Sequence, residues 1–262
     1  MHISRLFIHP IKSCAAIECQ RVELGPRGPL LDRAWMLVDA QSGRFVSQRK
    51  VARMALIEPV IKEDGVWVRA PGCEEFKLPM KGESVPVTVW DDSVEGLDCG
   101  DEAASWFSSF LDLSCRLVYQ GDCERQADTK YAPQKTSVSY ADGFPMLVIN
   151  QASIDYLDER CPQNDIVAQR FRANIVVSGA EAFSEESWQR LNTKNVKMMV
   201  VKPCQRCVIP SIDPQTAEKN KYVMQVLVDE CRRDGKVYFG QNLVFQCEAG
   251  SVLEVGDEIE IL

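Results

Sequence analysis

Two cysteines separated by two residues are the groups in this chain best suited to chemistry. Cys204 and Cys207 lie in the segment VKPCQRCVIPSIDP, with Arg206 between them and Lys202 just before. A thiolate beside fixed positive charges has a lowered pKa and is a good soft-metal ligand or nucleophile. The alternative, on this segment alone, is that one or both thiols are buried cysteines that pack as small hydrophobic side chains.

The backbone around the two thiols is predicted to be a loop at the end of a strand. The apolar run at residues 196–201 is typical of a buried strand and leads directly into the pair. Pro210 and Pro214 each remove a backbone donor and clash with the preceding turn, so the segment after the thiols cannot form a regular helix. Loops at strand ends often present functional groups, which favours a functional role for this one.

The composition is that of a soluble globular protein. The 262 residues fit one large domain or two modest ones, and 45% of them are hydrophobic while 26% are charged. The formal net charge of −8 argues against a nucleic-acid partner, because nucleic-acid-binding proteins normally carry a basic surface. A local basic pocket remains compatible with this overall charge.

The location is predicted to be cytoplasmic, with no membrane partner. The apolar run at the N-terminus is too short for a signal peptide and is soon interrupted by Pro10 and Lys12. No segment has the length of a membrane-spanning helix. The eleven cysteines are odd in number and irregularly spaced, so we interpret them as reduced thiols.

The first hundred residues are predicted to be mainly β. Short β-prone runs alternate with turn signals, and the predicted strands cover residues 3–9, 22–24, 34–38, 55–60, 66–69 and 85–90. A helix is predicted after Asp101 as its N-cap, because Ala103, Phe107 and Phe110 then fall on one face. Residues 116–119 form a further predicted strand.

The second half is predicted to begin near residue 120, before a polar, turn-rich stretch at residues 121–137. Its predicted strands cover residues 145–150, 171–178, 196–201, 237–239, 243–247 and 258–262. Helices are expected from residue 150 or 153 to 160 and within 218–234, with a short amphipathic turn or helix at 183–191 that directs Trp188 inward. Many short strands with few helices indicate a mainly β fold with some helices (α+β), barrel-like in both halves.

Several common chemistries are disfavoured by what the sequence lacks. Only His2 and His9 are available to a hydrolase triad, and no G-x-S-x-G segment exists. A zinc site is weakly supported because no second C-x-x-C matches the first, and the nucleotide-binding glycine fingerprints are absent. The prolines oppose a thioredoxin-type helix, and ferredoxin spacing is missing. A thiolate loop with cations at strand ends fits an anionic cofactor whose soft metal takes sulfur.

The segment KPCQRCVIPSIDPQT resembles the MOSC family, which includes the C-terminal domain of molybdenum-cofactor sulfurases and the core of the amidoxime-reducing enzymes. The resemblance covers essentially the whole chain and implies an N-terminal MOSC β-barrel domain at residues 1–119 and a MOSC domain at 120–262. Its other segments, in the family's order, are HPIKSC at residue 9, DRAW at 32, DCG at 98, YADGFPMLVIN at 140, FRANIVVSG at 171, ESW at 186, YFGQN at 238 and VGD at 255.

This resemblance implies a molybdenum cofactor (Mo-molybdopterin), a pyranopterin dithiolene that ends in a phosphate. It implies Cys207 as the metal ligand and catalytic residue, whereas spacing alone does not choose between Cys207 and Cys204. The residues that it implies for cofactor binding are Lys12, Ser13, Arg33, Gly143, Phe144, Arg172, Asn174, Gln205, Arg206 and Cys207. A phosphate is well matched by guanidinium, ammonium, hydroxyl and backbone donors. Taken singly, each cation could be an ordinary surface charge, and Asp213 could be a simple turn residue.

The implied activity is the reduction of small N-hydroxylated compounds from N–OH to N–H, with two electrons and two protons and release of water. The electrons are expected from a separate flavin or iron–sulfur partner, since no ferredoxin domain follows in this sequence. Two alternatives stay open: a non-catalytic carrier of the molybdenum cofactor, and a sulfur-transfer protein that works through a persulfide on Cys207.

Overall fold

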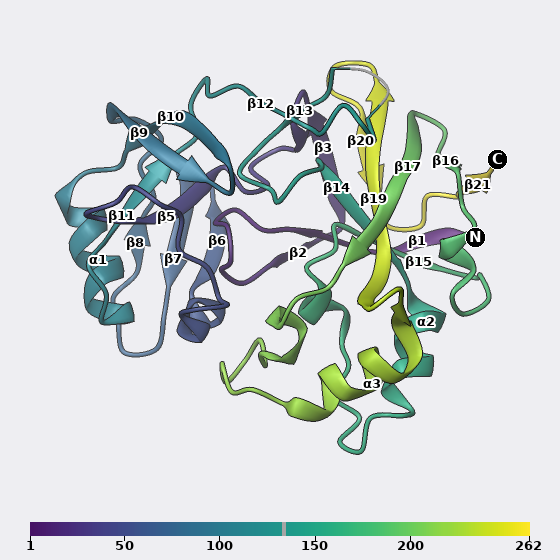
Figure 1. Cartoon of the computed structure of the whole chain (residues 1–262). Helices are drawn as coiled ribbons and strands as arrows, with labels where there is room; N and C mark the ends of the chain where they lie inside the picture. Colours follow the sequence, from purple (N-terminus) through teal and green to yellow (C-terminus); the bar gives the residue numbers. More distant parts are fainter. Residues whose placement is uncertain (133–134) are drawn as a thin grey trace.

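The regular structure of the chain is mainly β-strands, which form two adjoining groups of sheets, with few helices (Figure 1). The structure is a computed structural model, and it describes residues 1–132 and 135–262. The predicted fold class, mainly β with some helices, is confirmed. The predicted turn-rich stretch at 121–137 includes residues 133 and 134, which lie outside the described residues.

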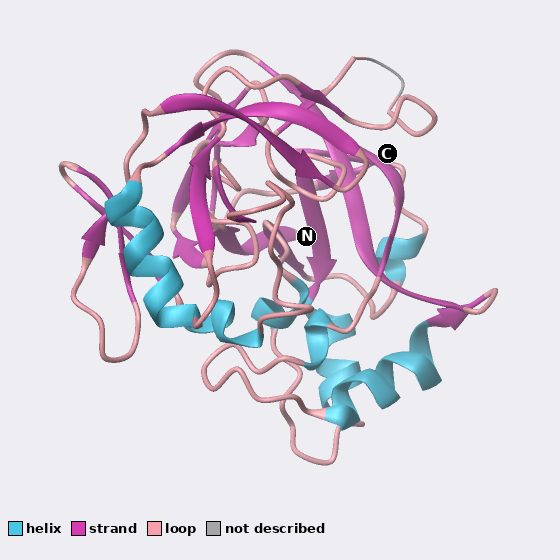
Figure 2. Ribbon diagram, turned by 60° about the vertical axis from the view of Figure 1, so that its left-hand side comes forward, coloured by secondary structure: helices cyan, strands magenta, loops and turns pink. Residues whose placement is uncertain are grey.

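The larger sheet has nine strands in the order β2-β1-β15-β14-β19-β17-β16-β21, with β18 paired to β19. It closes on itself, because Ile3 N donates to the Asp257 carbonyl oxygen at 2.9 Å and Ile259 N donates to that of Met1 at 3.0 Å. Figure 2 shows these strands wrapped around a common interior. The bounds are β1 His2–Ile8, β2 Ile17–Cys19, β14 Met146–Asn150, β15 Ile175–Ser178, β16 Arg190–Asn192, β17 Val196–Gln205, β18 Arg232–Arg233, β19 Lys236–Cys247 and β21 Glu260–Ile261.

Side chains alternate between the two faces of these strands. Those on one face fill the interior of the barrel, and those on the other face pack against the helices outside it. Leu6, Val148, Val177 and Leu243 belong to the interior cluster. Their neighbours, including Phe7, Ile149 and Val176, instead pack outside against helices. This is the period-two pattern expected of strands that are buried on both faces.

Smaller sheets make up most of the first half. One has the order β5-β11-β10-β9, a second β6-β7-β8, a third β20-β3-β4, and β12 pairs with β13. Their bounds are β3 Arg21–Gly25, β4 Gly28–Pro29, β5 Trp35–Asp39, β6 Glu58–Lys62, β7 Gly65–Arg69, β8 Phe76–Lys77, β9 Glu83–Val89, β10 Asp92–Asp98, β11 Cys115–Tyr119, β12 Arg125–Gln126, β13 Ser137–Val138 and β20 Val252–Glu254. Strands β1 and β3 pair with β15 and β20, so the two halves share sheets, and the division near residue 120 stays a prediction.

Within residues 1–132 and 135–262, three α-helices cover the sheets. Helix α1 (Asp101–Leu111) buries Ala103, Phe107 and Phe110 in the core of the first half. Helices α2 (Gln151–Asp158) and α3 (Lys221–Cys231) pack on the outer face of the barrel, and both start at asparagine caps. The described residues also contain four 3-10 turns: η1 Ala52–Leu56, η2 Ala168–Phe171, η3 Ser184–Glu186 and η4 Ile209–Ser211. In the described residues, no helix is long and apolar enough to cross a membrane.

Two predicted strands near the site were wrong in their limits. The strand predicted at 171–178 starts only at Ile175, because the η2 turn ends at Phe171 and its C-cap, Arg172, has a left-handed φ of 56°. The strand predicted to end at residue 201 continues to Gln205. Register shifts against β19 on both sides of Pro203 allow the chain to bend there and still pair. Cys204 therefore lies in the strand, and the loop begins at Arg206.

Other boundaries also differ from the prediction. Part of the strand predicted at 55–60 is the η1 turn, and residues 237–247 form one strand, β19, instead of two. Asp101 is the first helical residue of α1 and pairs with Arg116, with Gly100 in the cap position. Helix α3 lies within residues 218–234 as predicted, and the Asn220 side chain caps its start. Trp188 is buried in the barrel interior as predicted, although only residues 184–186 before it are helical.

Candidate functional site

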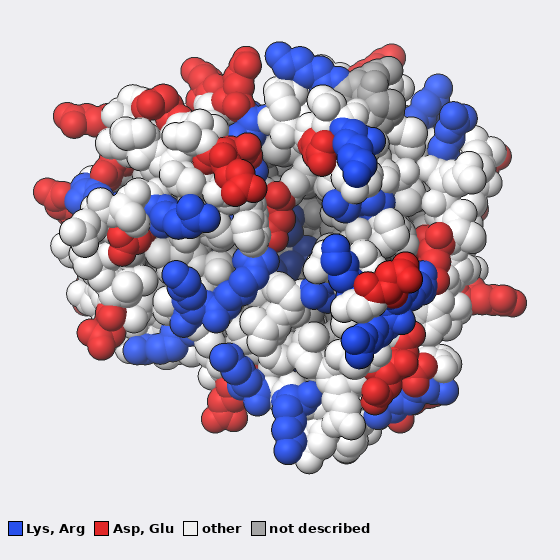
Figure 3. Space-filling view, viewed as in Figure 1, with Lys and Arg blue, Asp and Glu red and all other residues white. Residues whose placement is uncertain are grey.

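One cavity is lined by all ten residues that the resemblance implies for cofactor binding. Lys12 and Ser13 follow β1, Arg33 precedes β5, Gly143 and Phe144 precede β14, Arg172 and Asn174 lie between η2 and β15, and Gln205, Arg206 and Cys207 lie at the end of β17. Figure 3 shows a central hollow with lysine and arginine side chains on both sides. The structure brings the ten residues together, while their roles toward a ligand remain predictions.

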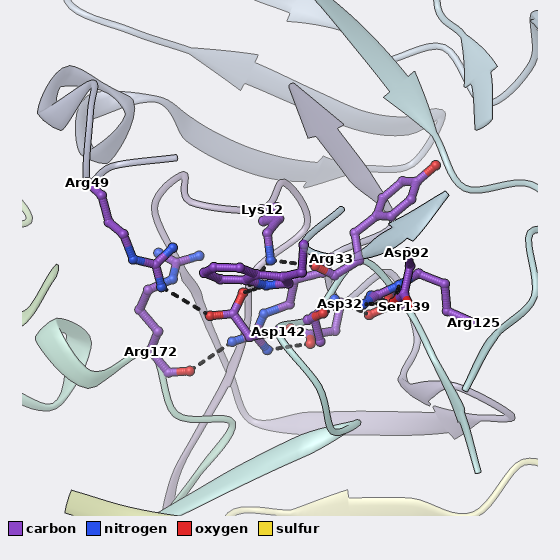
Figure 4. A network of polar contacts seen from close by, with 12 residues as sticks. Lys12, Asp32, Arg33, Arg49, Asp92, Arg125, Ser139, Asp142 and Arg172 are labelled. Atoms are coloured by element: carbon purple, nitrogen blue, oxygen red, sulfur yellow. Dashed lines mark hydrogen bonds and ion pairs between the residues drawn. The ribbon is translucent and has the colours of Figure 1, made fainter. Parts of the chain in front are cut away.

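Lys12 is a buried cation at this cavity. Its Nζ donates to the Tyr140 carbonyl oxygen at 2.8 Å and pairs with the Asp142 carboxylate. Burial lowers the pKa of Lys12 to about 8, although the Asp142 charge opposes this shift. Figure 4 shows Lys12, Arg33 and Asp142 turned toward one another. Lys12 therefore carries a positive charge at neutral pH that is held inside the protein.

Arg33 links the two halves of the chain across the cavity. Its Nη1 pairs with Asp32 and donates to Asn174 Oδ1 at 3.1 Å, while Nη2 donates to the Arg172 carbonyl oxygen at 2.9 Å. Asp32 is buried, which raises its pKa, but Arg33 and His9 more than offset this and hold the pKa below its usual value. Asn174 also accepts from Leu147 N at 3.2 Å and donates to the Phe7 carbonyl oxygen at 3.2 Å. These bonds make Asn174 a support for Arg33.

Arg172 is partly buried, and one nitrogen of its guanidinium group is left without a hydrogen-bond partner among the described residues. Its Nη1 donates to the Cys14 carbonyl oxygen at 2.6 Å, whereas its buried Nη2 has no hydrogen-bond partner among the described residues. Burial and the neighbouring charge of Arg33 lower the pKa of Arg172 to about 10. Its left-handed backbone is the turn that brings this side chain to the cavity.

Arg206, between the two thiols, is also held by hydrogen bonds to backbone carbonyl oxygens. Its Nε donates to the Phe239 carbonyl oxygen at 2.8 Å and its Nη1 to that of Phe171 at 2.9 Å. The buried Nη2 lacks a partner in the described part of the chain. Gly240, with φ of 75°, leaves room for it, since a Cβ there would lie 3.2 Å from Arg206 Nη2.

The two thiols both line the cavity and are partly buried. The expectation of a lowered thiol pKa was wrong for Cys204. Burial raises its pKa, and the nearby Arg206 and Lys202 charges only partly compensate. Cys204 packs against the apolar cluster under α2 and α3, which explains its desolvation. It resembles a structural cysteine more than a reactive one.

Arg170, which the sequence reasoning missed, fixes the segment after Cys207. Its fully buried side chain donates to the carbonyl oxygens of Asp165 at 2.5 Å and Pro210 at 3.2 Å, and to Asp213 Oδ2 at 2.9 Å. Asp213 Oδ1 also accepts from Gln215 N and Thr216 N, each at 2.8 Å. Asp213 therefore makes the hydrogen bonds of a turn residue, and Arg170 extends them into a clamp between η2 and η4.

Nor did the sequence indicate that Asp142 and Arg125 support the site. Asp142 pairs with Lys12 and accepts from Trp90 Nε1 at 3.2 Å and from Arg49 Nη2 at 3.4 Å. Arg125 is buried, and its Nη1 donates to the carbonyl oxygens of Ser139 at 2.6 Å and Ala141 at 2.8 Å. Figure 4 shows Arg125, Asp92 and Ser139 together at one side of this network. The motif YADGFP contains Asp142, but only long-range contacts reveal its partners.

The donor set of the cavity fits an anionic ligand that also carries a soft metal. Six of its lining side chains are cations, namely Lys12, Arg33, Arg49, Arg170, Arg172 and Arg206, against the one carboxylate of Asp142. The unpartnered nitrogens of Arg172 and Arg206 are suited to phosphate oxygens. In the described residues, no group of three or more His, Cys, Asp or Glu side chains could hold a bare metal ion. The residues present therefore fit a phosphate-bearing metal cofactor with one thiol ligand.

Two family models match this chain, one in each half. Residues 1–114 match the MOSC N-terminal beta barrel domain, and residues 135–260 match the MOSC domain. The chain belongs to the MOSC family.

Curated relatives cover nearly all of the chain. Molybdenum cofactor sulfurase of Bos taurus is 33% identical over 98% of this chain. Mitochondrial amidoxime reducing component 2 of Bos taurus is 34% identical over 82% of the chain and 67% of that protein. Mitochondrial amidoxime-reducing component 1 of Mus musculus is 30% identical over 99% of the chain and 82% of that protein. The chain spans about a third of the length of the sulfurases that it matches (32% for the Bos taurus protein).

Proposed function

We propose that this protein binds the molybdenum cofactor and reduces small N-hydroxylated compounds from N–OH to N–H, with release of water. The observation that carries the proposal is the convergence of Cys207 with Lys12, Arg33, Arg172 and Arg206 on one cavity. The amidoxime-reducing relatives, which match most of their own length, support the reaction class.

In this proposal the four cations neutralise the charge of the cofactor and its phosphate. Arg172 and Arg206 each offer a buried nitrogen that has no partner among the described residues, so an anion there gains charge-assisted hydrogen bonds that the protein does not already satisfy. Lys12 and Arg33 are preorganised by their bonds to backbone carbonyl oxygens. Preorganised donors lose little entropy when the ligand binds.

Cys207 would hold the metal through its thiolate. Its loop is fixed on one side by β17 and on the other by the Arg170–Asp213 clamp, so the sulfur has a defined position relative to the cations. The bound cofactor would supply the two-electron chemistry. The chain's own contribution is to place the thiol, hold the cofactor's charge and shape the space in which the substrate meets the metal.

The electrons would come from a separate flavin or iron–sulfur protein, since the described residues contain no cluster of ligands for a further metal centre. The described cysteines are all free, and we propose a reducing compartment, the cytoplasm, for the protein. The test of the reaction depends on neither the identity of the electron donor nor the compartment.

The test is turnover of benzamidoxime by molybdenum-loaded protein with a chemically reduced viologen as electron donor. We expect benzamidine to form, at a rate proportional to molybdenum content, and Cys207→Ala to abolish it. Protein with stoichiometric molybdenum that forms no benzamidine and no product from an N-hydroxylated nucleobase would contradict the reductase proposal and favour the cofactor carrier.

Sulfur transfer is the second candidate, because the sulfurase of Bos taurus matches 98% of the chain. In that case metal-free protein would carry a persulfide on Cys207. Cyanide would then release thiocyanate from the wild type and from Cys204→Ala but not from Cys207→Ala. This outcome, together with inactive loaded protein, would replace the reductase proposal.

A further inference from the structure

The tip of the β9–β10 hairpin carries a tryptophan in a conformation that bulky residues rarely adopt. Asp92 pairs with Val89 across this hairpin, so Trp90 and Asp91 form a two-residue turn. Trp90 has a φ of 57°, which is left-handed. Turns of this length favour glycine or asparagine where φ is positive, because a large side chain is strained there. Such strain persists where other contacts hold the residue in place, and it is enriched at functional sites.

The hairpin tip is fastened to residues 139–142, which lead directly into the cavity of the candidate site. Asp92 Oδ2 accepts from Arg125 Nε at 3.0 Å and from Nη2 at 2.8 Å. Arg125 Nη1 in turn donates to two backbone carbonyl oxygens of this segment. Trp90 Nε1 donates to Asp142 Oδ1 at 3.2 Å. The contacts that hold the strained turn are therefore made with the edge of the cavity.

Asp142 is the one carboxylate among the described residues that line this cavity. Its side chain is 60% exposed, so water could solvate it. It is instead held by Lys12, by Arg49 Nη2 at 3.4 Å and by the Trp90 N–H, which come from three separate parts of the chain. Figure 4 shows Lys12 and Arg49 turned toward Asp142. The carboxylate therefore lies where an anionic ligand would meet the same two cations.

The bond from Trp90 differs in kind from the two ion pairs. Lys12 and Arg49 line the cavity and can pair with either Asp142 or an anionic ligand. Trp90 is not one of the described residues that line the cavity, so its N–H favours the carboxylate alone. The indole ring also packs on Arg49, whose Cζ lies 4.7 Å from the ring centroid. Trp90 thus fixes both the carboxylate and one of its cations.

We propose that Trp90 is a positioning residue that keeps the Asp142 carboxylate in the cavity as an internal counter-anion, which an incoming oxyanion must displace in order to bind. Lys12 and Arg49 exchange partners in this step, and no covalent bond forms or breaks. The counter-anion keeps the buried charge of Lys12 paired in the metal-free protein. The link to the cofactor rests on the proposed function, since the natural oxyanion would then be the phosphate of the cofactor.

The test is the binding of inorganic sulfate to metal-free protein, measured by calorimetry at low ionic strength. We expect Trp90→Phe to bind sulfate about 3- to 5-fold more tightly, because the substitution removes the N–H bond to Asp142 but keeps an aromatic ring beside Arg49. In an Asp142→Ala background, the same substitution should change the affinity less than about twofold, since the acceptor is gone. This double-mutant cycle separates an effect through Asp142 from a general structural one.

Trp67→Phe is the matched control. Trp67 Nε1 donates to Asp64 Oδ1 at 2.9 Å, and Lys77 Nζ donates to Asp64 Oδ2 at 2.9 Å. A tryptophan, a carboxylate and a lysine therefore meet in the same way, at a position outside the cavity. We expect this variant to change the sulfate affinity less than about twofold.

Tryptophan fluorescence gives an independent readout of the displacement. Sulfate should change the fluorescence of the wild type, because the Trp90 indole loses its carboxylate partner, and this change should be absent from Trp90→Phe. Unchanged sulfate affinity in folded Trp90→Phe, or an equal gain in the Asp142→Ala background or in Trp67→Phe, would overturn the proposal. Should Trp90→Phe not fold, Trp90→Gly decides, since glycine accepts the left-handed φ and also lacks the N–H.

The two proposals fail separately. Sulfate affinity that depends on Trp90, in protein that takes up no molybdenum from a host that makes the cofactor, would support the counter-anion and reject the reductase. Benzamidoxime turnover by the wild type, together with unchanged sulfate affinity in Trp90→Phe, would reject the counter-anion and leave the reductase function standing.

Discussion

Arg170 Nη2 lies 2.9 Å from Asp213 Oδ2, and this contact joins the turn before Arg172 to the segment after Cys207. The Arg170 side chain has no solvent exposure, while that of Asp213 is 23% exposed. Two parts of the candidate site that are far apart in the sequence therefore depend on one guanidinium. The cation at Arg172 and the thiol at Cys207 are positioned together.

We expect Arg170→Met to destabilise the protein by roughly 2–4 kcal/mol, because it leaves two carboxylates without their buried partner. The measurement is the free energy of unfolding in urea. Arg160→Met is the control, since its ion pair with Glu230 lies at the surface, and it should cost about 1 kcal/mol or less. Equal losses in the two variants would show that Arg170 does not act as a clamp.

Gly240, where an added Cβ would lie 3.2 Å from Arg206 Nη2, is expected to tolerate no side chain. An added Cβ would lie 2.6 Å from Ile149 Cγ2 and 2.9 Å from the Val148 carbonyl oxygen, and φ is 75°. Gly235 has a φ of 77° but no heavy atom of the described residues within 4 Å of that position. Gly235→Ala should therefore cost only the backbone strain, about 1 kcal/mol, and Gly240→Ala about 2–4 kcal/mol, measured by urea unfolding. A difference below about 0.5 kcal/mol between the two would contradict the packing argument.

Anion binding should weaken as Lys12 loses its proton. Its pKa of about 8 in the folded protein means that the charge is present below pH 8 and lost above it. Sulfate is a suitable probe, because its own charge is constant over this range. We expect its affinity for metal-free protein to fall about 5- to 10-fold between pH 7 and pH 9, a range that stays below the pKa of about 10 of Arg172, and to stay nearly constant in Lys12→Arg. A fall of equal size in Lys12→Arg would assign the effect to another group.

Loss of the Lys12 proton, which weakens anion binding, should instead increase the free energy of unfolding. Between pH 8 and the ordinary lysine pKa of 10.5, the unfolded chain binds more protons than the folded one at this position. The contribution of Lys12 to the free energy of unfolding therefore rises with pH across that window. Urea unfolding of wild type and Lys12→Met should show this rise in wild type only. A rise of equal size in Lys12→Met would exclude Lys12 as its source.

Asp142 competes with a bound anion for Lys12 and Arg49. Replacing it with Asn removes that competition, so we expect Asp142→Asn to raise sulfate affinity about 5- to 10-fold at low ionic strength and less at high salt. Asp122→Asn makes the same change in net charge at an exposed position and serves as the control. An affinity gain that is equal in both variants would be a general charge effect and would contradict the competition.

The parts of the site that could be predicted from the sequence are those with a local signal. Cys207, Lys12, Arg33 and Arg172 stand beside strands or within motifs that resemble the MOSC family, and the structure places all four at one cavity. The mainly β fold follows similarly from short alternating runs and turn residues. Exact strand limits did not follow, because bulges in β17 and the left-handed turn at Arg172 depend on contacts with distant strands.

The supporting residues could not be predicted because their partners are remote in sequence. Arg170 bonds to Asp213, and Arg125 bonds to Ser139 and Asp92, yet nothing in the flanking sequence distinguishes them from surface arginines. The thiol pKa of Cys204 was predicted in the wrong direction for a related reason. Adjacent cations in the sequence indicate a lowered value, whereas burial against the helices, which only the fold creates, raises it.

The most direct test of the account is the molybdenum content and X-ray absorption spectrum of protein from a host that makes the cofactor. We expect wild type and Cys204→Ala to contain nearly one molybdenum per chain, with the same sulfur coordination. Cys207→Ala should have less metal or one sulfur ligand fewer, since the cations could retain the cofactor by its phosphate. Absence of molybdenum from all three proteins, or loss of a sulfur ligand in Cys204→Ala instead, would contradict the assignment of Cys207.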